Sequence, residues 1–369
     1  MTLLISIPWF YPAYKAGGPI QSVQNLVNNY QDPGYFIITG KKDADGSPVA
    51  IAGFDKWNFF SKNTQVCYTN KPVSEINNAV KKFNPQILFI IGLFDFNFNI
   101  RPLFFSKIPV KILSARGMLH PGALSQKHFK KKLFIFLMKL SGIHKKILFH
   151  ATNETEKKYI SAIFGSKAKV MVAQNFPHLV SKKENIAKVP QRLNLVTIAL
   201  ISPMKNHALV LDALQSCKGE INYVIYGPVK DKAYWEVCLQ KISTLPPNIR
   251  VQYEGEIRPE HIETALHKAD VFIMPSKSEN YGHAIIEALS AGLPVITSQH
   301  TPWQNLQENK AGFNTAQTAA EIAVAISNFT AMDAAVFNEW CSAASAYAHE
   351  HTRVDTIKAQ YDQLFSVAG

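Results

Sequence analysis

Short, continuous runs of apolar residues alternate with amphipathic stretches along this chain. Runs that are apolar at every position are typical of parallel strands whose sheet is covered by helices on both faces. In the first half, strands are predicted at the apolar or mostly apolar runs Leu3–Pro8, Tyr35–Thr39, Ile87–Ile91, Val110–Ser114 and Ile147–Ala151. After the first run, Val23, Leu26 and Val27 have the spacing of one helix face, which predicts a helix that begins near Gln21.

The same alternation restarts after a polar interruption. The stretch 181–191 (SKKENIAKVPQ) is predicted to be a linker because its polar composition breaks the rhythm. Beyond it, a helix is predicted at His207–Leu214. Strands are predicted at Leu195–Leu200, Tyr223–Tyr226, Val251–Tyr253, Val271–Met274 and Pro294–Thr297. A chain of 369 residues has the length of two domains, which agrees with two series of strands and helices.

We therefore predict an α/β protein with two Rossmann-like domains, each built on a doubly wound parallel sheet. The first domain covers residues 1–180, the linker 181–191 and the second domain 192–350. Residues 351–369 are expected to form a C-terminal helix that packs back on the first domain. Because ligands of such sheets bind beyond the C-terminal ends of the strands, we expect the domains to face each other across a cleft.

Composition indicates a folded protein in a reducing compartment. Hydrophobic residues make up 47% of the chain and charged residues 18%, which excludes a disordered chain. No apolar run approaches the roughly 20 residues of a membrane-spanning helix, and the N-terminus lacks the features of a signal peptide. The cysteines are scattered without metal-binding spacing (Cys67, Cys217, Cys238, Cys341). We expect free, buried thiols and a cytoplasmic location.

The net charge of +12 comes from the first half of the chain. Residues 1–180 contain 23 lysines and arginines against 8 acidic residues, whereas the remainder contains 16 against 19. This excess of positive charge would suit a partner that is nucleic acid, an anionic membrane surface or a phosphorylated substrate. A basic surface without a partner would also account for it. Residues 128–139, followed by Lys145 and Lys146, combine lysines with aromatic and aliphatic side chains. Such a helix either lies on an anionic membrane or packs on the core with solvated lysines.

The stretch from Val271 to Pro294 (VFIMPSKSENYGHAIIEALSAGLP) has the most specific pattern in the chain. A strand runs into Ser276, and a polar loop then precedes a helix that begins near His283. The polar loop consists of Glu279, Asn280, Tyr281 and Gly282. Backbone N–H groups at the start of such a helix form a site for an anion, and a diphosphate would fit it.

Glu279 and Glu287 are the two carboxylates of this segment, eight residues apart. On one continuous helix they would be separated by roughly 12 Å. A nucleophile and acid pair would need about 5 Å, so we do not expect them to act as such a pair. Instead we expect Glu279, in the loop, to face the substrate. Glu287 would accept hydrogen bonds from ribose hydroxyls, as acidic residues do in other nucleotide-binding folds.

This segment resembles the retaining GT-B glycosyltransferases of glycosyltransferase family 4 (group 1), which act in bacterial surface-polysaccharide synthesis. Their hallmark is E-x7-E, in a pattern like P-S-x-x-E-x-F/Y-G-x-x-x-x-E-A-x-x-x-G-x-P-V, and this chain has PSKSENYGHAIIEALSAGLPV. The resemblance extends over nearly the whole chain. It implies that Glu279 faces a transferred sugar. It also implies that a nucleotide-sugar donor is contacted by Ser276, Asn280, Tyr281, Gly282 and Glu287.

Two further elements resemble the family. Residues 201–206 (ISPMKN) match the R-x-S-x-x-K element, which implies that Lys205 stabilises the charge on the leaving diphosphate. Gly17 and Gly18 match the glycine loop, where the backbone approaches donor phosphates and acceptor, although an ordinary tight turn would also use glycine. The family usually has an arginine where this chain has Leu200. Three explanations of this departure are open. Another basic residue replaces the arginine, the backbone N–H groups alone suffice to bind the diphosphate, or catalysis is impaired.

Arg116 is our candidate to replace the missing cation. Residues 114–120 (SARGMLH) resemble the family's S-x-H/R-G-M-L stretch, which lies near the transferred sugar. Either Arg116 or His120 would take the role that a histidine usually holds there, and structural roles for both are the alternative. The basic face also implies peripheral contact of the first domain with the inner face of an anionic plasma membrane.

The resemblance as a whole implies a glycosyltransferase of the hexosyltransferase type (EC 2.4). It would move a sugar from a UDP- or GDP-sugar to a glycan or lipid-linked acceptor, in surface polysaccharide or lipopolysaccharide synthesis. The first domain would hold the acceptor and the second the donor, with retention of configuration and without a metal or other cofactor. A GT-B sugar-nucleotide epimerase would need acid/base residues that are not matched here. A basic protein that binds polyanions without catalysis would leave the two glutamates unexplained, and we expect no nucleic-acid partner.

Overall fold

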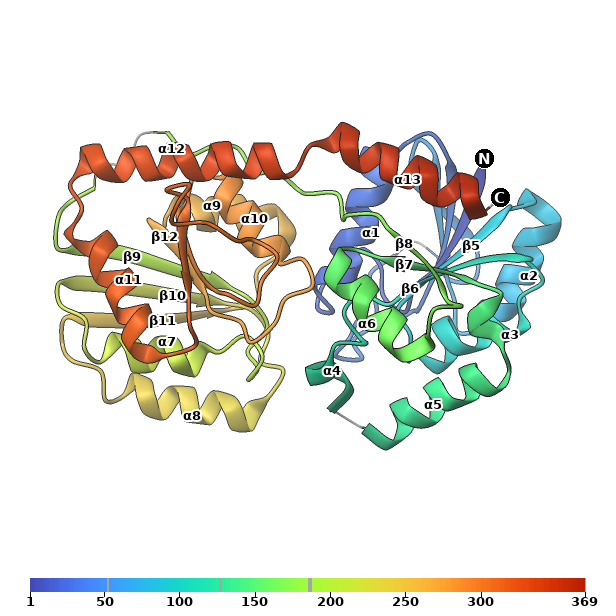
Figure 1. The fold of residues 1–369 in the computed structure, drawn as a ribbon, viewed down its shortest axis with the longest axis horizontal. Helices are drawn as coiled ribbons and strands as arrows, with labels where there is room; N and C mark the ends of the chain where they lie inside the picture. Colours follow the sequence, from blue (N-terminus) through green and yellow to red (C-terminus); the bar gives the residue numbers. More distant parts are fainter. Residues whose placement is uncertain (52, 126–127, 185–187, 369) are drawn as a thin grey trace. The chain divides into compact units, whose positions relative to one another are not determined.

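The computed structural model describes residues 1–51, 53–125, 128–184 and 188–368 of the chain. They form two compact units, each with its own sheet. The first unit contains Met1–Phe176 together with Val354–Gly369, and the second contains Pro177–Arg353. In Figure 1 the first unit is blue to green and also includes the red helix α13 (Val354–Ala368).

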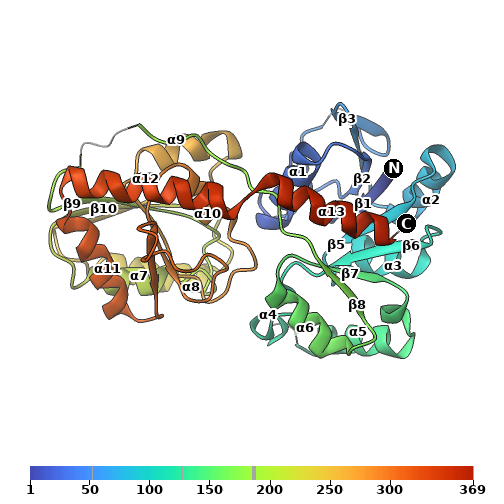
Figure 2. The ribbon, with the colours of Figure 1, turned by 45° about the horizontal axis from the view of Figure 1, so that its top comes forward.

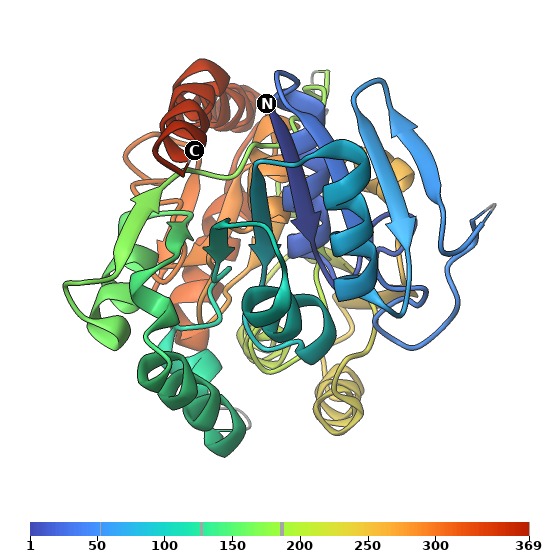
Figure 3. The same ribbon diagram turned by 90° about the vertical axis from the view of Figure 1, so that its right-hand side faces the viewer.

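The first unit is built on an eight-stranded sheet with the order β3-β4-β2-β1-β5-β6-β7-β8, whose strands lie side by side in Figure 3. Its strands are β1 (Thr2–Ser6), β2 (Gly34–Thr39), β3 (Trp57–Ser61), β4 (Thr64–Tyr68), β5 (Ile87–Ile91), β6 (Val110–Ser114), β7 (Leu148–Ala151) and β8 (Lys169–Val172). Its helices, besides α13, are α1 (Gly18–Asn29), α2 (Pro72–Phe83), α3 (Arg101–Phe105), α4 (Pro121–Ser125), α5 (His128–Leu140) and α6 (Glu154–Phe164), with short π and 3₁₀ turns at Phe96–Ile100 and Ile143–Lys145.

Alternate residues along each central strand enter two separate cores. In β1, Leu3 and Ile5 pack in a core with α1 and α13, whereas Leu4 packs in a second core with α2, α5 and α6. Side chains of successive strand residues point to opposite faces of a sheet, so a run that is apolar throughout is buried on both faces. The five strands predicted in this half lie within two residues of the observed ones.

One strand of the first sheet departs from the parallel arrangement that the sequence predicted. β3 pairs antiparallel with β4 at the edge of the sheet, while all the other neighbours are parallel. β3 is mostly half-buried, and Phe59 is 82% exposed. A strand that buries so little has no continuous apolar run, and for this reason the sequence analysis did not detect it.

The second unit has a six-stranded, wholly parallel sheet with the order β11-β10-β9-β12-β13-β14. Its strands are β9 (Arg192–Ile198), β10 (Glu220–Tyr226), β11 (Ile249–Gly255), β12 (Val271–Met274), β13 (Val295–Ser298) and β14 (Gly312–Thr315). Its helices are α7 (His207–Leu214), α8 (Lys232–Ile242), α9 (Ile262–His267), α10 (His283–Ser290), α11 (Ala319–Ala331) and α12 (Ala334–His351), with a 3₁₀ turn at Pro259–His261.

Helices cover both faces of this second sheet as well. α7, α8 and α11 contribute to one core, and α9 and α10 to the other, while α12 contributes to both (Figure 2). The order of the strands is that of a doubly wound Rossmann sheet, with the first strand of the unit beside the fourth. The fold class predicted from the sequence is therefore confirmed for the two sheets.

The boundaries between the units differ from those predicted. The described residues of the stretch 181–191, predicted as a linker, are grouped with the second unit. The amide of Lys183 donates to the carbonyl of Ala291 at 2.9 Å, and Lys188 is only 6% exposed. Residues 185–187 lie outside the described part of the chain.

The C-terminal residues belong to the first unit. Tyr361, Leu364 and Phe365 of α13 are buried in the core that also contains α1, and Tyr30 donates a hydrogen bond from its hydroxyl to Asp362 at 2.5 Å. Among the described residues no single helix is long and apolar enough to cross a membrane. One pair, Ala319–Ala331 with Ala334–Val367, passes by length and composition but is bent by 119°.

Candidate active site

The strand order places two loops at the topological switch point of the second sheet. From β9 the chain proceeds outward through β10 and β11, and from β12 it proceeds outward in the opposite direction through β13 and β14. Residues 199–206 follow β9 and residues 275–282 follow β12, so the two loops flank the crevice in which open α/β sheets bind ligands. Lys205 lies in the first loop and Glu279 in the second.

Hydrogen bonds hold these two loops together. The amide of Lys277 donates to the carbonyl of Met204 at 2.8 Å, and Nδ2 of Asn206 donates to the carbonyl of Pro275 at 3.3 Å. Asn206 has a φ of +64°, in the left-handed region that asparagine tolerates better than most residues. The first loop is thus fixed against the second on both sides of Lys205.

Lys205 and Glu279 form an ion pair in which Nζ donates to Oε1 at 2.5 Å. Their side chains are 21% and 10% exposed, so the pair remains accessible to a ligand while water screens it little. An ammonium group held in this position can form charge-assisted hydrogen bonds with phosphate oxygens. Lys205 and Glu279 were predicted from two different sequence motifs and are 74 positions apart. In the structure they meet at the switch point.

Helix α10 begins at His283, directly after Gly282. Gly282 has a φ of +79°, and a Cβ atom there would lie 3.1 Å from Cδ1 of Ile285. Within the described part of the chain, no side chain caps α10 or α7, the helices that follow the two central strands, whereas Asp231 caps α8 and Thr318 caps α11. Two helix N-termini, each with the positive end of its dipole, are thus present at the switch point.

The loop before α10 is anchored by its neighbours. Ser276 is fully buried, and its carbonyl accepts a hydrogen bond from Oγ of Ser298 at 2.5 Å. Nε1 of Trp303 donates to the carbonyl of Tyr281 at 2.6 Å, and the two rings lie 5.3 Å apart. Trp303 is 5% exposed and serves as a core residue that fixes this loop. Asn280 lies between these anchored residues and is partly exposed. It directly follows Glu279 in the sequence.

Glu287 lies one turn inside α10, with its side chain only 3% exposed. Nδ1 of His178 lies 3.3 Å from its Oε1. This hydrogen bond raises the pKa of His178, because a neighbouring carboxylate favours the protonated imidazole. His178 was not predicted from the sequence, because it stands in a segment (NFPHLV) without a periodic or family pattern.

We expect an NMR titration to give His178 a pKa above its ordinary value of about 6.5. Because the pKa of His178 is raised in the folded state, the His178–Glu287 pair contributes its full stabilisation at pH values below the ordinary pKa of histidine. The contribution is lost as the pH rises through the folded-state pKa. Since 56% of the His178 side chain is exposed, the pKa is a better measure than stability. The variant Glu287→Gln should lower the pKa of His178, and an unchanged pKa in that variant would contradict the assignment.

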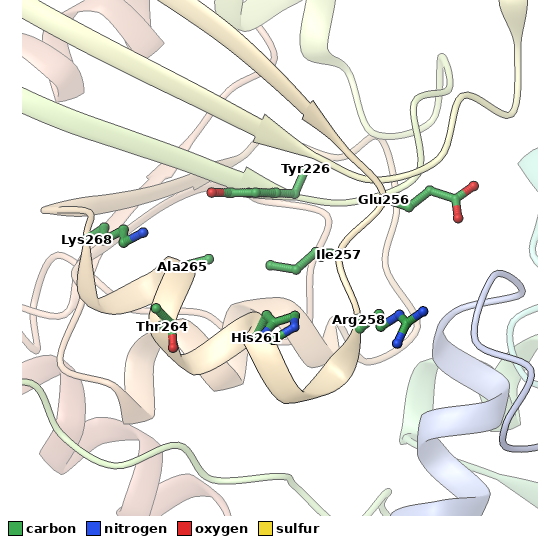
Figure 4. Close-up of a pocket in the computed structure, with 8 residues that line it drawn as sticks. All are labelled: Tyr226, Glu256, Ile257, Arg258, His261, Thr264, Ala265 and Lys268. Carbon is green, nitrogen blue, oxygen red and sulfur yellow. The ribbon is translucent and has the colours of Figure 1, made fainter.

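A pocket of 460 Å³ lies in the second unit where β10 and β11 end. Figure 4 shows the ring of Tyr226 over Ala265 and Ile257, with Arg258 at one end of the pocket and Lys268 at the other. The remaining lining residues are Glu256, His261 and Thr264. The pocket is therefore a partly apolar slot with charged ends, at the same edge of the sheet as Lys205.

In the first unit, the glycine loop follows β1, next to the switch point between β1 and β5. Gly17 has a φ of +71°, and α1 begins at Gly18 without a side-chain cap. The buried carboxylate of Asp43 accepts hydrogen bonds from the amides of Tyr14 at 3.0 Å and Lys15 at 3.2 Å, which fixes this loop. A single aspartate in a polar stretch carries no sequence signal, so the analysis missed it.

Arg116 follows β6 in the first unit, with a φ of +51°. Its Nη1 donates to Asn175, whereas Nε and Nη2 are buried without a hydrogen-bond partner in the described part of the chain. Glu156 fixes the backbone here, since its carboxylate accepts from the amides of Gly117 at 2.5 Å and Thr152 at 2.7 Å. Buried donors without partners are costly, and the hydroxyl of Tyr361 interacts with the same guanidinium, so Arg116 is a candidate to bind a ligand that offers oxygen atoms.

His120 lies in the same loop in a different environment. Its Nδ1 accepts from the amide of Gly122 at 3.1 Å, and its ring packs edge-on against Tyr159 at 5.2 Å. A third histidine, His150, is fully buried, and burial together with the charge of Arg116 lowers its pKa to about 3. Of these residues, Arg116 alone combines a positive charge with unsatisfied buried donors.

Comparison with known proteins agrees with this architecture. The sucrose-phosphate synthase of Thermosynechococcus elongatus has a TM-score of 0.73 at 16% identity, with 99% of this chain and 98% of that chain covered. HepE of Anabaena, solved in complex with UDP-glucose, has a TM-score of 0.72 at 18% identity, with both chains fully covered. At such low identity the likeness establishes the fold alone: the chain has the GT-B fold, as predicted.

The family follows from the sequence of the second unit. Residues 181–335 match the model of the family described as glycosyl transferases group 1, so this part of the chain belongs to that family. The sulfoquinovosyl transferase of Arabidopsis thaliana is 32% identical over 108 residues, a match that spans 28% of this chain and 19% of the plant protein. The match confirms the resemblance for residues 181–335, which lie in the second unit.

Proposed function

We propose that this protein is a retaining glycosyltransferase. It transfers a sugar from a UDP- or GDP-sugar to a glycan or lipid-linked acceptor in surface polysaccharide or lipopolysaccharide synthesis. The observation that carries the proposal is the Lys205–Glu279 ion pair at the switch point of the second sheet, beside two helix N-termini without side-chain caps. A diphosphate needs a cation and a set of N–H donors, and both are present there.

Each remaining part of the donor has a candidate partner in the second unit. Glu287, one turn inside α10, accepts the ribose hydroxyls, which requires that His178 give up its hydrogen bond or share it. The base occupies the pocket under Tyr226, whose apolar floor and polar ends suit a flat heterocycle. Ser276, Asn280, Tyr281 and Gly282 form the loop that carries Glu279 to the transferred sugar.

The first unit holds the acceptor in this proposal. Gly17 and Gly18 allow the backbone to approach the substrates closely, because no side chain intervenes. Arg116 offers its Nε and Nη2 to oxygen atoms of a substrate, which favours Arg116 over His120 as the group that contacts the sugar or a phosphate. The sequence left these two residues as alternatives, and the unsatisfied donors of Arg116 are the reason for the choice.

The proposed transfer is a front-face displacement. The bond from the anomeric carbon to the phosphate oxygen breaks, and the acceptor hydroxyl oxygen forms the new bond on the same face. The hydroxyl proton passes to the departing phosphate. Lys205 stabilises the negative charge that develops on the diphosphate, where a fixed cation lowers the barrier most. We propose that no metal ion or other cofactor takes part, so transfer should proceed unchanged in EDTA.

A thermal-shift panel of UDP-, GDP-, ADP- and dTDP-sugars tests the function. We expect one nucleotide class to raise Tm selectively, because a ligand that binds only the folded state stabilises it. Product analysis with that donor should then show transfer of the sugar. Conversion of the donor to an isomeric nucleotide sugar would identify an epimerase instead. Stabilisation by polyanions alone, lost with added salt, would identify a polyanion-binding protein and contradict the proposal.

The departure at Leu200 yields a separate prediction. If a second cation on the diphosphate is missing from the second unit, Leu200→Arg should tighten binding of the selected nucleoside diphosphate by about tenfold, the effect of one charge-assisted hydrogen bond. Leu200→Gln is the matched control, since it adds a polar group of similar reach without charge. Calorimetric titration of both variants measures the effect, and equal affinities of the two variants would show that charge is not limiting there.

A further inference from the structure

Strand β11 (Ile249–Gly255) forms one edge of the second sheet, and in the described part of the chain it pairs with β10 alone. Most of its residues are exposed, and its sequence (IRVQYEG) contains neither lysine nor proline. Natural proteins usually cover an edge strand or blunt it with such residues, because unpaired backbone groups along an edge bind other strands. β11 is therefore an open edge of 7 residues.

The backbone of β11 has donors and acceptors on its outer side. Ile221 of β10 pairs with Ile249, and the amide of Ile221 donates to the carbonyl of Asn248 at 3.0 Å. In a parallel pair only alternate residues of a strand bond to a given neighbour, so the N–H and C=O groups of Val251 and Tyr253 point outward. The outward amide of Ile249 already donates to a carbonyl of the preceding turn at 3.0 Å. Within the described residues, the amides of Val251 and Tyr253 have no such partner.

The order of residues in β11 is self-complementary about Gln252. A twofold axis at Gln252 would pair the strand antiparallel with a second copy and set Val251 opposite Tyr253. The two outward amides of each copy, four in all, would then donate to outward carbonyls of the other copy. The same axis sets Arg250 opposite Glu254, and opposite charges across an antiparallel pair attract each other. The backbone and the charges therefore select the same register.

Arg250 and Glu254 are available for this pairing. Both are exposed, and neither forms an ion pair in the described part of the chain. A register shift between β10 and β11 makes Glu254 the extra residue of a bulge. The stretch from Val251 to Tyr253 precedes this bulge, so the bulge does not interrupt the new pairing.

Apolar side chains flank the same axis on one face of the sheet. The ring of Tyr253 lies 4.7 Å from that of Trp235 in α8, and Leu239 follows one turn later on that helix. Tyr253 is 38% exposed and Leu239 is 40% exposed. Residues that lie opposite each other in an antiparallel pair point to the same face, so the axis brings Val251 and Tyr253 of the two copies together there. A second copy thus covers apolar surface as well as backbone.

The charges of β11 favour a second copy over two other states of this edge, a solvated strand and a strand that binds a foreign peptide. A strand protected against pairing has charges that repel a second copy, whereas β11 has opposite charges at equal distances from Gln252. A peptide from another protein would need the complementary order of charges by coincidence. A second copy provides that order with the same residues.

We propose that the protein forms a homodimer in which the two β11 strands pair antiparallel about Gln252. The pairing joins two six-stranded sheets into one continuous sheet. Because the strands of the two copies run in opposite directions, their C-terminal ends lie at opposite edges of the joined sheet. The two Lys205–Glu279 pairs therefore do not form a shared site. The proposal is independent of sugar transfer, since association is measured without any substrate.

Sedimentation velocity of the full-length protein at about 1–100 µM tests the association. We expect a reversible shift from monomer to dimer with concentration, since an interface of one strand pair and a few side chains is small and binds weakly. A monomer at all of these concentrations would overturn the proposal. Open-ended assembly would also overturn it, because a twofold contact closes on itself.

Reversal of the two charges tests the register. Arg250→Glu and Glu254→Arg should each weaken self-association at least about tenfold, because each variant sets like charges opposite one another. An equimolar mixture of the two variants should form a heterodimer, and the double variant Arg250→Glu/Glu254→Arg should associate as the wild type does. Lys167→Glu, at an exposed position of the first unit, is the matched control and should dimerise normally. Equal Tm values check that all variants fold.

Two outcomes of the charge reversals would contradict the proposal. A dimer that is equally stable in both single variants would place the contact elsewhere on the protein. Single variants that remain monomeric when mixed would show that the charges of β11 do not face each other, since the mixture restores the attraction.

Val251→Pro tests the backbone hydrogen bonds. Proline removes an outward N–H group and is tolerated at such positions of an edge strand. It should abolish the dimer, whereas Val251→Ala, which keeps the N–H group, should retain it. In the wild type, hydrogen exchange of β11 should slow as the dimer forms. A dimer whose β11 amides exchange as fast as those of the monomer would show that this strand is not paired and would overturn the proposal.

Discussion

Lys205→Ala is expected to lower kcat/KM for the selected nucleotide sugar by about 10²-fold or more. The loss of one fixed donor at a developing negative charge typically costs about 10²–10³ in rate. Because the lysine is paired with Glu279 in the free protein, most of the loss should appear in kcat, when the diphosphate charge develops, and less in KM. Glu279→Gln should also lower kcat, by at least about tenfold, with KM less affected.

Lys241→Ala is the matched control for this experiment. Lys241 pairs with Asp212 at 2.5 Å in the same unit, with its side chain 31% exposed. It lies at the C-terminal end of α8, away from the edge of the sheet that carries Lys205. Lys241→Ala should retain full activity. If both alanine variants lose the same small amount of activity, the Lys205–Glu279 pair is a structural ion pair, and the site assignment fails.

Glu287→Gln should abolish discrimination between ribose and deoxyribose. If the carboxylate accepts hydrogen bonds from ribose hydroxyls, wild-type protein should bind the selected nucleoside diphosphate about 10–100-fold more tightly than its 2′-deoxy or 3′-deoxy analogue, since a hydrogen bond to a charged group contributes about 1.5–3 kcal/mol. The variant should bind ribo and deoxy forms almost equally. Glutamine has the shape of glutamate, so α10 should keep its packing.

A second variant serves as the control for this experiment. His178→Ala removes the group that occupies Glu287 in the free protein, so it should leave the discrimination intact and raise affinity slightly. Calorimetric titration of each variant with the ribo and deoxy nucleotides gives the affinity and the discrimination between the two forms. A Glu287→Gln variant that discriminates as well as the wild type would show that the ribose lies elsewhere.

The sequence predicted the central strands well because burial on both faces leaves continuous apolar runs. β5, β6 and β12 were predicted to the residue, since no polar position interrupts the buried part of each strand. β3, β4, β8 and β14 were missed. Three of them are edge strands, and all four are short and contain polar residues. The stretch 181–191, predicted as a linker from its polar composition, has described residues that hydrogen bonds connect to the second unit.

For the candidate site, sequence reasoning found the groups that belong to a dense motif. The loop with Glu279 and the helix with Glu287 could be read from one contiguous segment, and Lys205 from a second. The residues that hold the loops, such as Asp43 and Glu156, were not found. They act through single hydrogen bonds to backbone amides that are distant in sequence, and such contacts have no periodicity or spacing to detect.

The central claim is that a nucleoside diphosphate binds where β9 and β12 end, between Lys205 and the N-terminus of α10. A crystal structure of the protein with the nucleoside diphosphate selected by the thermal-shift panel tests this most directly. We expect the phosphate oxygens within hydrogen-bond distance of Nζ of Lys205 and of backbone amides at the start of α10, with the ribose on Glu287. A diphosphate bound at any other place, with the Lys205–Glu279 pair undisturbed, would contradict it.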